Sequence, residues 1–264
     1  RVLVVGGGPA GMKAAAVAAE RGHRVTLYEA EAQLGGQARL AQLLPHRLEF
    51  GGIITNLARE MTLAGVEVVT GSRVDRALIE GAAPDAVVLA TGARPRRPEI
   101  EGAEAAHVVD AWQVLRGEAN VGGSVVVADW RADWIGIGIA EKLAGEGCRV
   151  RLCVNGTTPG QTIQQYVRDM AIGRLHKLGV EWISYLRLFG ADGDSVYFQH
   201  TTSGEPVVCE GVETLVLCQG HERVAELETE LEGCGLEVHL AGDCLAPRTA
   251  EEAVLEGLKV GSAL

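Results

Sequence analysis

The chain begins Arg1-Val-Leu-Val-Val-Gly6-Gly-Gly8-Pro-Ala-Gly11, an apolar run followed at once by a G-x-G-x-x-G pattern. The pattern predicts a strand, a tight turn and a helix. Gly6 permits the turn, Gly8 allows the backbone to approach a pyrophosphate, and Gly11 allows the helix to pack on the strand. The backbone N–H groups at the N-terminus of the helix suit an anion, and Pro9 and Ala10, which stand inside the motif, are candidate cofactor-binding residues as well. The stretch therefore predicts a dinucleotide-binding site.

A second strand supports this site, because G-x-G-x-x-G alone is a weak signal. The apolar run Val25–Tyr28 is followed by Glu29. That position lies about 20 residues beyond the glycines, where dinucleotide-binding folds place a carboxylate that accepts a hydrogen bond from a ribose hydroxyl. Glu29 and the adjacent Ala30 are therefore candidate cofactor-binding residues.

The composition predicts a soluble globular protein with one large or two small domains. Of the 264 residues, 47% are hydrophobic, and 35 are glycines, which suit many tight turns between strands and helices. The net charge of -11 argues against a nucleic-acid partner. Since no run of about 18 apolar residues lacks a charge, we expect no membrane span. The apolar N-terminus is broken by glycines and proline, so we expect no signal peptide and a cytoplasmic location.

Six cysteines occur without a C-x-x-C pair, the spacing typical of zinc sites, iron–sulfur clusters and thioredoxin-type dithiols. Several stand in apolar runs, where cysteine behaves as a small hydrophobic residue. We therefore expect buried free thiols and no metal site. The six are Cys148, Cys153, Cys209, Cys218, Cys234 and Cys244.

The sequence indicates no catalytic nucleophile and base. The seven histidines are scattered, and no G-x-S-x-G elbow accompanies the serines. Any redox chemistry would belong to a bound cofactor, which the protein places and whose electrostatics it adjusts.

Strand-like apolar runs alternate with helical patterns, which predicts an α/β fold with a mostly parallel sheet. We expect strands at Val2–Val5, Val25–Tyr28, Val66–Val69, Ala86–Leu89, Ser124–Ala128, Val150–Val154, Val180–Ile183, Val196–His200 and Leu215–Cys218, and helices at Gly11–Arg21, Leu48–Ala64, Gly136–Gly145 and Gln161–Leu178. The turn residues around Ala191–Val208 predict an appended antiparallel hairpin.

A second dinucleotide turn is expected after the strand Ser124–Ala128 if the chain contains two tandem binding folds. The turn reads instead Asp129-Trp-Arg-Ala-Asp-Trp-Ile-Gly136, with charged and bulky side chains where a pyrophosphate needs bare backbone. We expect it to exclude that ligand. Arg131 could bind a phosphate, and Asp129 or Asp133 could simply cap the helix that follows.

Three further motifs favour a flavin-type first site: Leu34-Gly35-Gly36-Gln37, Leu89-Ala90-Thr91-Gly92-Ala93 and Leu240-Ala241-Gly242-Asp243. With them the chain resembles the flavoproteins built from two Rossmann-like dinucleotide-binding folds, as in glutathione reductase. The resemblance implies that the Gly35-Gly36 turn, with Gln37, follows the pyrophosphate. It also implies that Ala90-Thr91-Gly92 marks the crossover and that Asp243, after Gly242, meets the flavin ribityl chain. It adds cofactor contacts at Val74, Thr249 and Ala250.

The same resemblance implies a split architecture. Residues 1–96 and 220–264 form an FAD-binding domain, and residues 97–219 form an inserted NAD(P)-type domain with a degenerate nucleotide turn, whose pattern begins near Ala103. FAD is favoured because Asp243 would matter only to a flavin. Asp243 could also be a helix-cap or turn residue, and ADP is then the alternative.

Two longer segments, 35–41 and 242–253, resemble the C-terminal half of NADH:flavin oxidoreductases related to Old Yellow Enzyme. This family includes trimethylamine and histamine dehydrogenases, 2,4-dienoyl-CoA reductase and, most similar, bacterial demethylases of dimethylglycine or N-methylproline. It implies a longer, homo-oligomeric parent whose FMN-binding TIM barrel and 4Fe-4S cluster are absent here. The start at a strand and the end within a helix also suggest an excised piece.

The degenerate turn at 129–136 resembles the amine-demethylating branch, in which electrons leave through a partner protein. We therefore expect an electron-transfer module of an amine dehydrogenase or demethylase. The alternatives are an NAD(P)H-dependent flavin reductase of the enoyl reductase type and a purely structural ADP-binding module.

Overall fold

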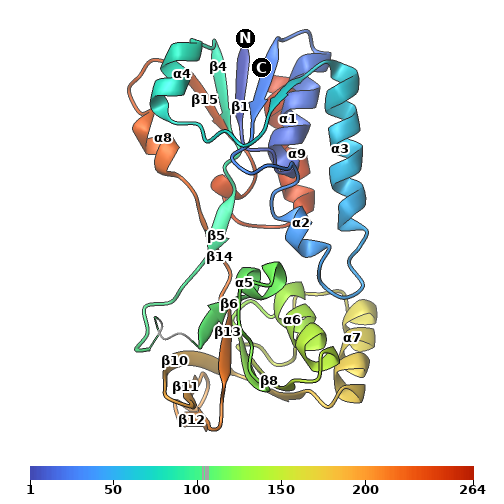
Figure 1. The fold of residues 1–264 in the computed structure, drawn as a ribbon, viewed down its shortest axis with the longest axis vertical. Coiled ribbons are helices and arrows are strands. Elements are labelled where there is room, and N and C mark those ends of the chain that lie inside the picture. The colour runs from blue at the N-terminus through green and yellow to red at the C-terminus, as the bar shows by residue number, and fades with distance from the viewer. Residues whose placement is uncertain (103, 105–106) are drawn as a thin grey trace. The chain divides into compact units, whose positions relative to one another are not determined.

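The computed structural model describes residues 1–102, 104 and 107–264, in which helices and strands alternate along much of the chain (Figure 1). The chain divides into two compact units: residues 1–43, 47–94 and 221–264 form the first, and residues 44–46 and 95–220 form the second. The expected start of the second pattern near Ala103 lies outside the described residues. The nucleotide-binding role of each unit stays a prediction.

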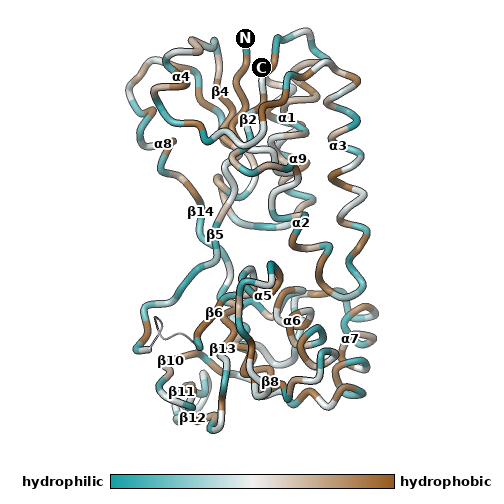
Figure 2. Tube along the Cα trace, in the orientation of Figure 1, coloured by the Kyte–Doolittle hydropathy of each residue, from teal (hydrophilic) through white to brown (hydrophobic). Residues whose placement is uncertain are grey.

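A five-stranded parallel sheet forms the centre of the first unit, in the order β15-β4-β1-β2-β3. Its strands are β1 (Val2–Val5), β2 (Val25–Tyr28), β3 (Glu67–Val69), β4 (Ala86–Leu89) and β15 (Glu237–Leu240). Figure 2 colours β1 and β4 as hydrophobic throughout, as expected for strands covered on both faces. Because β15 pairs with β4, the sheet joins the N-terminal and C-terminal parts of the chain.

Helices cover both faces of this sheet. One face packs against α1 (Pro9–Glu20), α3 (Phe50–Ala64) and α9 (Ala250–Ala263), and the other against α4 (Arg76–Ala82) and α8 (Glu226–Glu230). Helices α1 and α9 approach closely through a glycine, since a Cβ at Gly257 would lie 2.3 Å from the carbonyl oxygen of Ala10. The unit also contains α2 (Ala38–Ala41), the short helix η1 (Gly242–Cys244) and the strand β14 (His221–Arg223), which pairs with β5 (Ala93–Pro95), whose first two residues belong to this unit.

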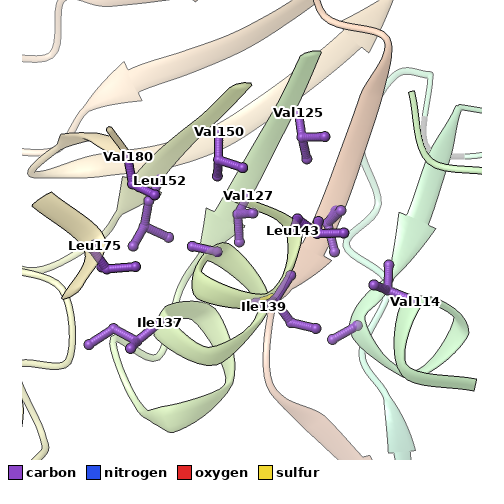
Figure 3. Close-up of a cluster of buried hydrophobic side chains, with 14 of the residues drawn as sticks. Val114, Val125, Val127, Ile137, Ile139, Leu143, Val150, Leu152, Leu175 and Val180 are labelled. Carbon is purple, nitrogen blue, oxygen red and sulfur yellow. The ribbon is translucent and has the colours of Figure 1, made fainter. Parts of the chain in front are cut away.

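The second unit has its own five-stranded parallel sheet, in the order β6-β13-β7-β8-β9. The strands are β6 (Val108–Asp110), β7 (Ser124–Asp129), β8 (Arg149–Val154), β9 (Glu181–Ile183) and β13 (Thr214–Cys218). Helices α5 (Ala111–Arg116), α6 (Trp134–Gly145) and α7 (Gln165–Lys177) cover one face. Figure 3 shows the side chains that meet there, among them Val127 and Leu152 from the sheet and Ile139 and Leu143 from α6.

Leu44 belongs to this same core, although it stands between α2 and α3 in the sequence. It is only 6% exposed. A Cβ at Gly138 of α6 would lie 2.7 Å from its Cδ2 atom. The neighbouring His46 contacts the buried Glu141 of α6, with 3.0 Å between Nε2 and Oε1. A short loop is thus docked against α6.

The other face of the second sheet packs against an antiparallel sheet of β10 (Leu186–Asp192), β11 (Ser195–His200) and β12 (Pro206–Cys209). The predicted antiparallel hairpin is present as β11 and β12, and β10 extends it to a third strand that the sequence did not indicate. The β-bulge between Leu188 and Gly190 breaks the two-residue alternation that identifies a strand.

The predicted α/β fold with parallel sheets is confirmed, and all nine predicted strands occur, three with the predicted bounds and six with one end shifted by one residue. Helix α7 begins at Gln165 rather than Gln161, because the Gln161 side chain instead accepts hydrogen bonds from Thr157 in the preceding loop. Within the part of the chain that the structure describes, no helix is long and apolar enough to cross a membrane.

Candidate functional site

The glycine-rich turn joins β1 to α1. At Gly6, with φ of +108°, a Cβ would lie 2.2 Å from the carbonyl oxygen of Ala90, and at Gly11 it would lie 1.9 Å from the oxygen of Gly6. Both positions therefore require glycine for packing. A Cβ at Gly8 would meet no heavy atom of the described residues within 4 Å. Gly8 thus borders open space, the property expected where a ligand approaches bare backbone.

The first turn of α1 is suited to an anion. Gly8 occupies the N-cap position, and no side chain in the described part of the chain caps the helix. Pro9 starts the helix, and its first turn carries no acidic residue. The free N–H groups and the positive end of the helix dipole therefore face the open space at Gly8.

Glu29 follows β2 and is 8% exposed. Its Oε2 accepts a hydrogen bond from the Gly7 N–H at 2.7 Å, and its Oε1 accepts one from the Glu31 N–H at 2.8 Å. These bonds hold the carboxylate beside the glycine turn, and each oxygen keeps a second lone pair for a sugar hydroxyl. Gly7 was not among the predicted residues, although its place inside the motif could have identified it.

The segment before Val74 runs beside Glu29. The Ser72 N–H donates to the Glu29 carbonyl at 2.9 Å, and the Gly71 N–H donates to the Glu31 carbonyl at 2.8 Å. Val74 itself packs against the sheet face covered by α4, whereas Ala30 is exposed.

The Gly35-Gly36 turn lies against the first glycine turn. The Gly35 N–H donates to the Gly7 carbonyl at 2.8 Å, and a Cβ at Gly36 would lie 3.1 Å from the Cα of Gly8. Both residues have positive φ, +118° and +49°. The two turns that the sequence indicated separately therefore form one surface.

Asp243 is held by two partners that are distant from each other in the sequence. Gln37 Nε2 donates to Asp243 Oδ2 at 2.8 Å, and the Arg248 N–H donates to Oδ1 at 3.0 Å. A Cβ at Gly92 would meet only Gln37 Nε2, at 3.9 Å, so Gly92 borders open space beside this pair. The Thr91 hydroxyl donates to the Val224 carbonyl at 2.7 Å, which anchors the strand end.

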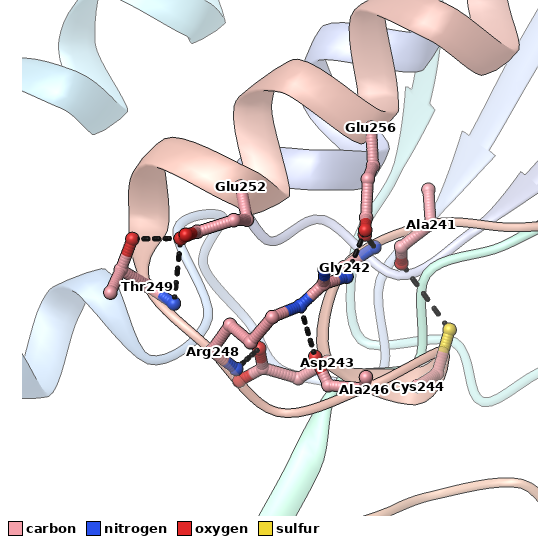
Figure 4. Close-up of polar contacts among 9 residues, drawn as sticks. All are labelled: Ala241, Gly242, Asp243, Cys244, Ala246, Arg248, Thr249, Glu252 and Glu256. Carbon is pink, nitrogen blue, oxygen red and sulfur yellow. Dashed lines mark hydrogen bonds and ion pairs between the residues drawn. The ribbon is translucent and has the colours of Figure 1, made fainter.

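Figure 4 shows how the loop around Asp243 is braced. The Gly242 N–H donates to Glu256 Oε2 at 2.8 Å, and the Arg248 side chain also bonds Glu256. Glu256 and Arg248 were not predicted, because a lone acid and base carry no motif. Thr249 and Ala250 stand at the start of α9, where the Thr249 N–H donates to Glu252 at 3.1 Å. The Thr249 hydroxyl also donates to Glu252 and lowers the pKa of this carboxyl.

The corresponding turn of the second unit is filled by its own side chains. Asp129 ends β7, and its Oδ1 accepts hydrogen bonds from the Arg131 and Ala132 N–H groups at 3.1 and 2.9 Å. A Cβ at Gly136 would lie 2.1 Å from Oδ2, so the carboxyl group packs on the first turn of α6. Of the two candidate caps, Asp133 is the N-cap and accepts the Ile135 N–H at 2.9 Å.

Asp129 is 2% exposed, and its Oδ2 has no hydrogen-bond partner among the described residues. Burial, with a smaller contribution from Asp133, raises the pKa of Asp129 to about 8. At neutral pH this carboxyl is therefore mostly protonated. Arg131, the candidate phosphate ligand, has its Nε 3.8 Å from Asp133 Oδ2.

Within the described ranges, no group of three or more His, Cys, Asp or Glu side chains could hold a metal ion. Four cysteines are buried free thiols, whereas Cys148 and Cys234 are partly exposed.

Known proteins similar to this chain are oxidoreductases. The family model described as pyridine nucleotide-disulphide oxidoreductase matches residues 1–257. N,N-dimethylglycine/sarcosine dehydrogenase of Chromohalobacter salexigens is 31% identical over 98% of this chain and 43% of its own length. NADH oxidase of Thermoanaerobacter brockii is 32% identical over 98% of this chain and 40% of its own length.

Among solved structures, a 2-naphthoyl-CoA reductase superposes with a TM-score of 0.91 at 28% identity, over the whole of this chain and 40% of that one. The chain thus spans about two fifths of the length of these relatives.

Proposed function

The chain belongs to the pyridine nucleotide-disulphide oxidoreductase family, and from this premise we propose that it is the FAD-binding, electron-transferring module of a longer amine dehydrogenase or demethylase. The observation that carries the proposal is the open backbone at Gly8, which faces the uncapped start of α1 beside the carboxylate of Glu29.

In this proposal the first unit holds a dinucleotide along its glycine turns. The N–H groups of Gly8 and of the first turn of α1 bind the pyrophosphate, and the Gly35-Gly36 turn covers it. Glu29 accepts a hydrogen bond from the adenosine ribose. The backbone around Ala30 and Val74 borders the adenine.

FAD is favoured over ADP because the site continues beyond what ADP needs. Gln37 and Arg248 orient Asp243 next to Gly92, which borders open space. A carboxylate in this place can accept hydrogen bonds from the ribityl hydroxyls of a flavin. When bound, the flavin supplies reversible electron transfer, and the chain supplies placement and electrostatics. The alternative is ADP as a structural ligand.

The second unit is proposed to receive no NAD(P)H. The N–H groups of Arg131, Ala132 and Ile135, which a pyrophosphate would need, already donate to Asp129 and Asp133. Electrons would then leave through a partner protein, as expected of an amine-oxidising parent. The similarity to an NADH oxidase favours the alternative of an NADH-dependent reductase.

The parent is proposed to carry the substrate chemistry outside residues 1–264. The relatives are more than twice as long as this chain, which leaves room for an FMN-binding barrel and a 4Fe-4S cluster. Dimethylglycine-type amines are the substrate class suggested by the dehydrogenase relative. The barrel would be the intramolecular partner, in a homo-oligomer.

An absorbance spectrum of the purified chain tests the proposal, followed by release of the bound nucleotide and its identification by mass. Flavin bands with released FAD would support a redox module, and NADH should then leave the flavin oxidised. A colourless protein that releases ADP would reject electron transfer and leave a structural nucleotide. Rapid bleaching by NADH would instead support the reductase alternative.

A further inference from the structure

Two cysteine side chains meet in the core of the second unit. Cys153 lies in β8 of the parallel sheet, and Cys209 ends β12 of the antiparallel sheet. Their Sγ atoms are 4.0 Å apart, and each residue is 1% exposed. From this juxtaposition we infer that Cys153 and Cys209 form a redox-active dithiol, which a hydroperoxide converts into a disulfide between the two sheets.

The surroundings distinguish the two sulfurs. The Cys153 thiol donates a hydrogen bond to Cys209, which lowers the pKa of Cys209 and raises that of Cys153. The positive charge of Arg151 lowers the pKa of both thiols, against the effect of their burial. Arg151 Nη2 donates to the carbonyl of Glu210 at 2.6 Å, so the guanidinium is tied to the residue that follows Cys209. Because the thiolate is the nucleophile, Cys209 reacts first.

The reaction has two balanced steps. The Cys209 thiolate attacks one oxygen of hydrogen peroxide, the O–O bond breaks, and Cys209 sulfenic acid and hydroxide form. The Cys153 sulfur then attacks the sulfenic sulfur, and the Cys153 thiol proton leaves with the displaced oxygen as water. The hydroxide of the first step takes up the proton that Cys209 released when it ionised. In sum, two thiols lose two electrons and two protons to one peroxide, which becomes two water molecules.

The geometry allows this bond with little rearrangement. A disulfide has an S–S length of about 2.05 Å, so the sulfurs must approach by about 2 Å. Glu210 and Gly211 are exposed, so the chain reaches the surface directly after the buried Cys209. The two cysteines are 56 positions apart in the sequence, and cross-linking a loop of that length restricts the unfolded chain strongly.

Peptide mapping of the purified chain tests the inference. The reduced protein is treated with a series of hydrogen peroxide concentrations, alkylated after denaturation and digested without reductant. We expect a peptide pair joined through Cys153 and Cys209, lighter by two hydrogen atoms and separable by dithiothreitol. We also expect the Tm of the second unit to rise by about 5 °C or more. Peroxide treatment that leaves both thiols free for alkylation would overturn the inference, as would pairing of either with another cysteine.

Three variants distinguish the role of Cys209, which reacts with peroxide, from that of Cys153, which completes the disulfide. Cys153→Ala should leave a sulfenic acid at Cys209 that dimedone traps, whereas Cys209→Ala should leave Cys153 unoxidised. Cys148→Ala removes a partly exposed thiol of the same unit and should retain the cross-link. A cross-link lost equally in all three variants would contradict the assignment. If a variant of Cys153 or Cys209 does not fold, the peptide map of the unmodified protein still shows whether the disulfide forms. This result does not depend on whether the first unit binds a nucleotide.

Discussion

Gly8 and Gly11 stand in one turn but under different constraints. A Cβ atom at Gly11 would overlap the carbonyl oxygen of Gly6, whereas a Cβ atom at Gly8 would enter open space. Gly8 also has φ of -76°, which any residue adopts. The structure therefore separates a glycine needed for packing from one that we propose is needed for ligand binding.

This difference predicts opposite phenotypes for two alanine variants. Gly8→Ala should fold with a free energy of unfolding within about 1 kcal/mol of the unmodified apo-protein. It should bind FAD or ADP at least about tenfold more weakly, because its methyl group enters the pyrophosphate space. Gly11→Ala should lose several kcal/mol of stability, since backbone must move. Urea unfolding of apo-protein and nucleotide titration measure both effects. Gly52→Ala, at an open position in α3, is the control: it should leave nucleotide affinity unchanged and raise the free energy of unfolding by no more than about 1 kcal/mol through helix propensity.

We expect the burial of Asp129 to make the free energy of unfolding fall as the pH rises. Its pKa is raised to about 8 in the folded chain, so between about pH 4 and pH 8 the folded state holds a proton that the unfolded state has released. Stability from this group is therefore present at low pH and falls as pH rises, by up to about 1.4 kcal/mol per pH unit.

Asp129→Asn removes this titration and keeps the acceptor oxygen. We expect the variant to gain stability relative to the unmodified protein between pH 5 and pH 8, as measured by urea unfolding. Exposed Asp169→Asn provides the matched control. The free energy of unfolding of Asp129→Asn is compared with that of the unmodified protein at each pH. If the difference between them stays the same across this range, Asp129 is not buried as described.

At the scale of elements, the loop before α3 is a part of the second core. Leu44 is 6% exposed in contact with α6, whereas its neighbour Leu43 is 49% exposed. Alanine substitutions at these two adjacent leucines therefore test whether the loop packs against α6.

Leu44→Ala should destabilise the second unit by about 2–5 kcal/mol, because it leaves a cavity against α6. Leu43→Ala should cost less than about 0.5 kcal/mol. All four tryptophans, Trp112, Trp130, Trp134 and Trp182, belong to the second unit, so tryptophan fluorescence during urea unfolding reports on it. Equal effects of the two variants would mean that the loop is not held at α6.

For the whole molecule, the proposal requires one nucleotide-binding unit and one unit closed to nucleotides. Because every tryptophan is in the second unit, NADH bound there would quench tryptophan emission and show energy transfer. We expect no such signal, with a Kd weaker than about 1 mM. Saturable energy transfer at micromolar NADH would favour the NADH-dependent reductase instead.

The sequence by itself determined the local features: the strand, turn and helix at residues 1–20, the acid at Glu29, and the alternation that makes an α/β fold. These follow from hydrophobic period and from the few residues that a tight turn accepts, and both are properties of short segments. The bulged strand β10 and the short strands β5, β6, β14 and β15 were missed, because they offer too little regular alternation to identify a strand.

Only the tertiary structure decided which segments meet. Gln37 and Asp243 are 206 positions apart and form a hydrogen bond. Leu44 packs in the core of the second unit, unlike the residue before it. Cys153 of one sheet contacts Cys209 of another. The burial that raises the pKa of Asp129 is likewise a property of the packed turn, not of its sequence. Such contacts depend on how whole elements pack, because no local rule of propensity or spacing specifies the partner of a side chain that lies far away along the chain.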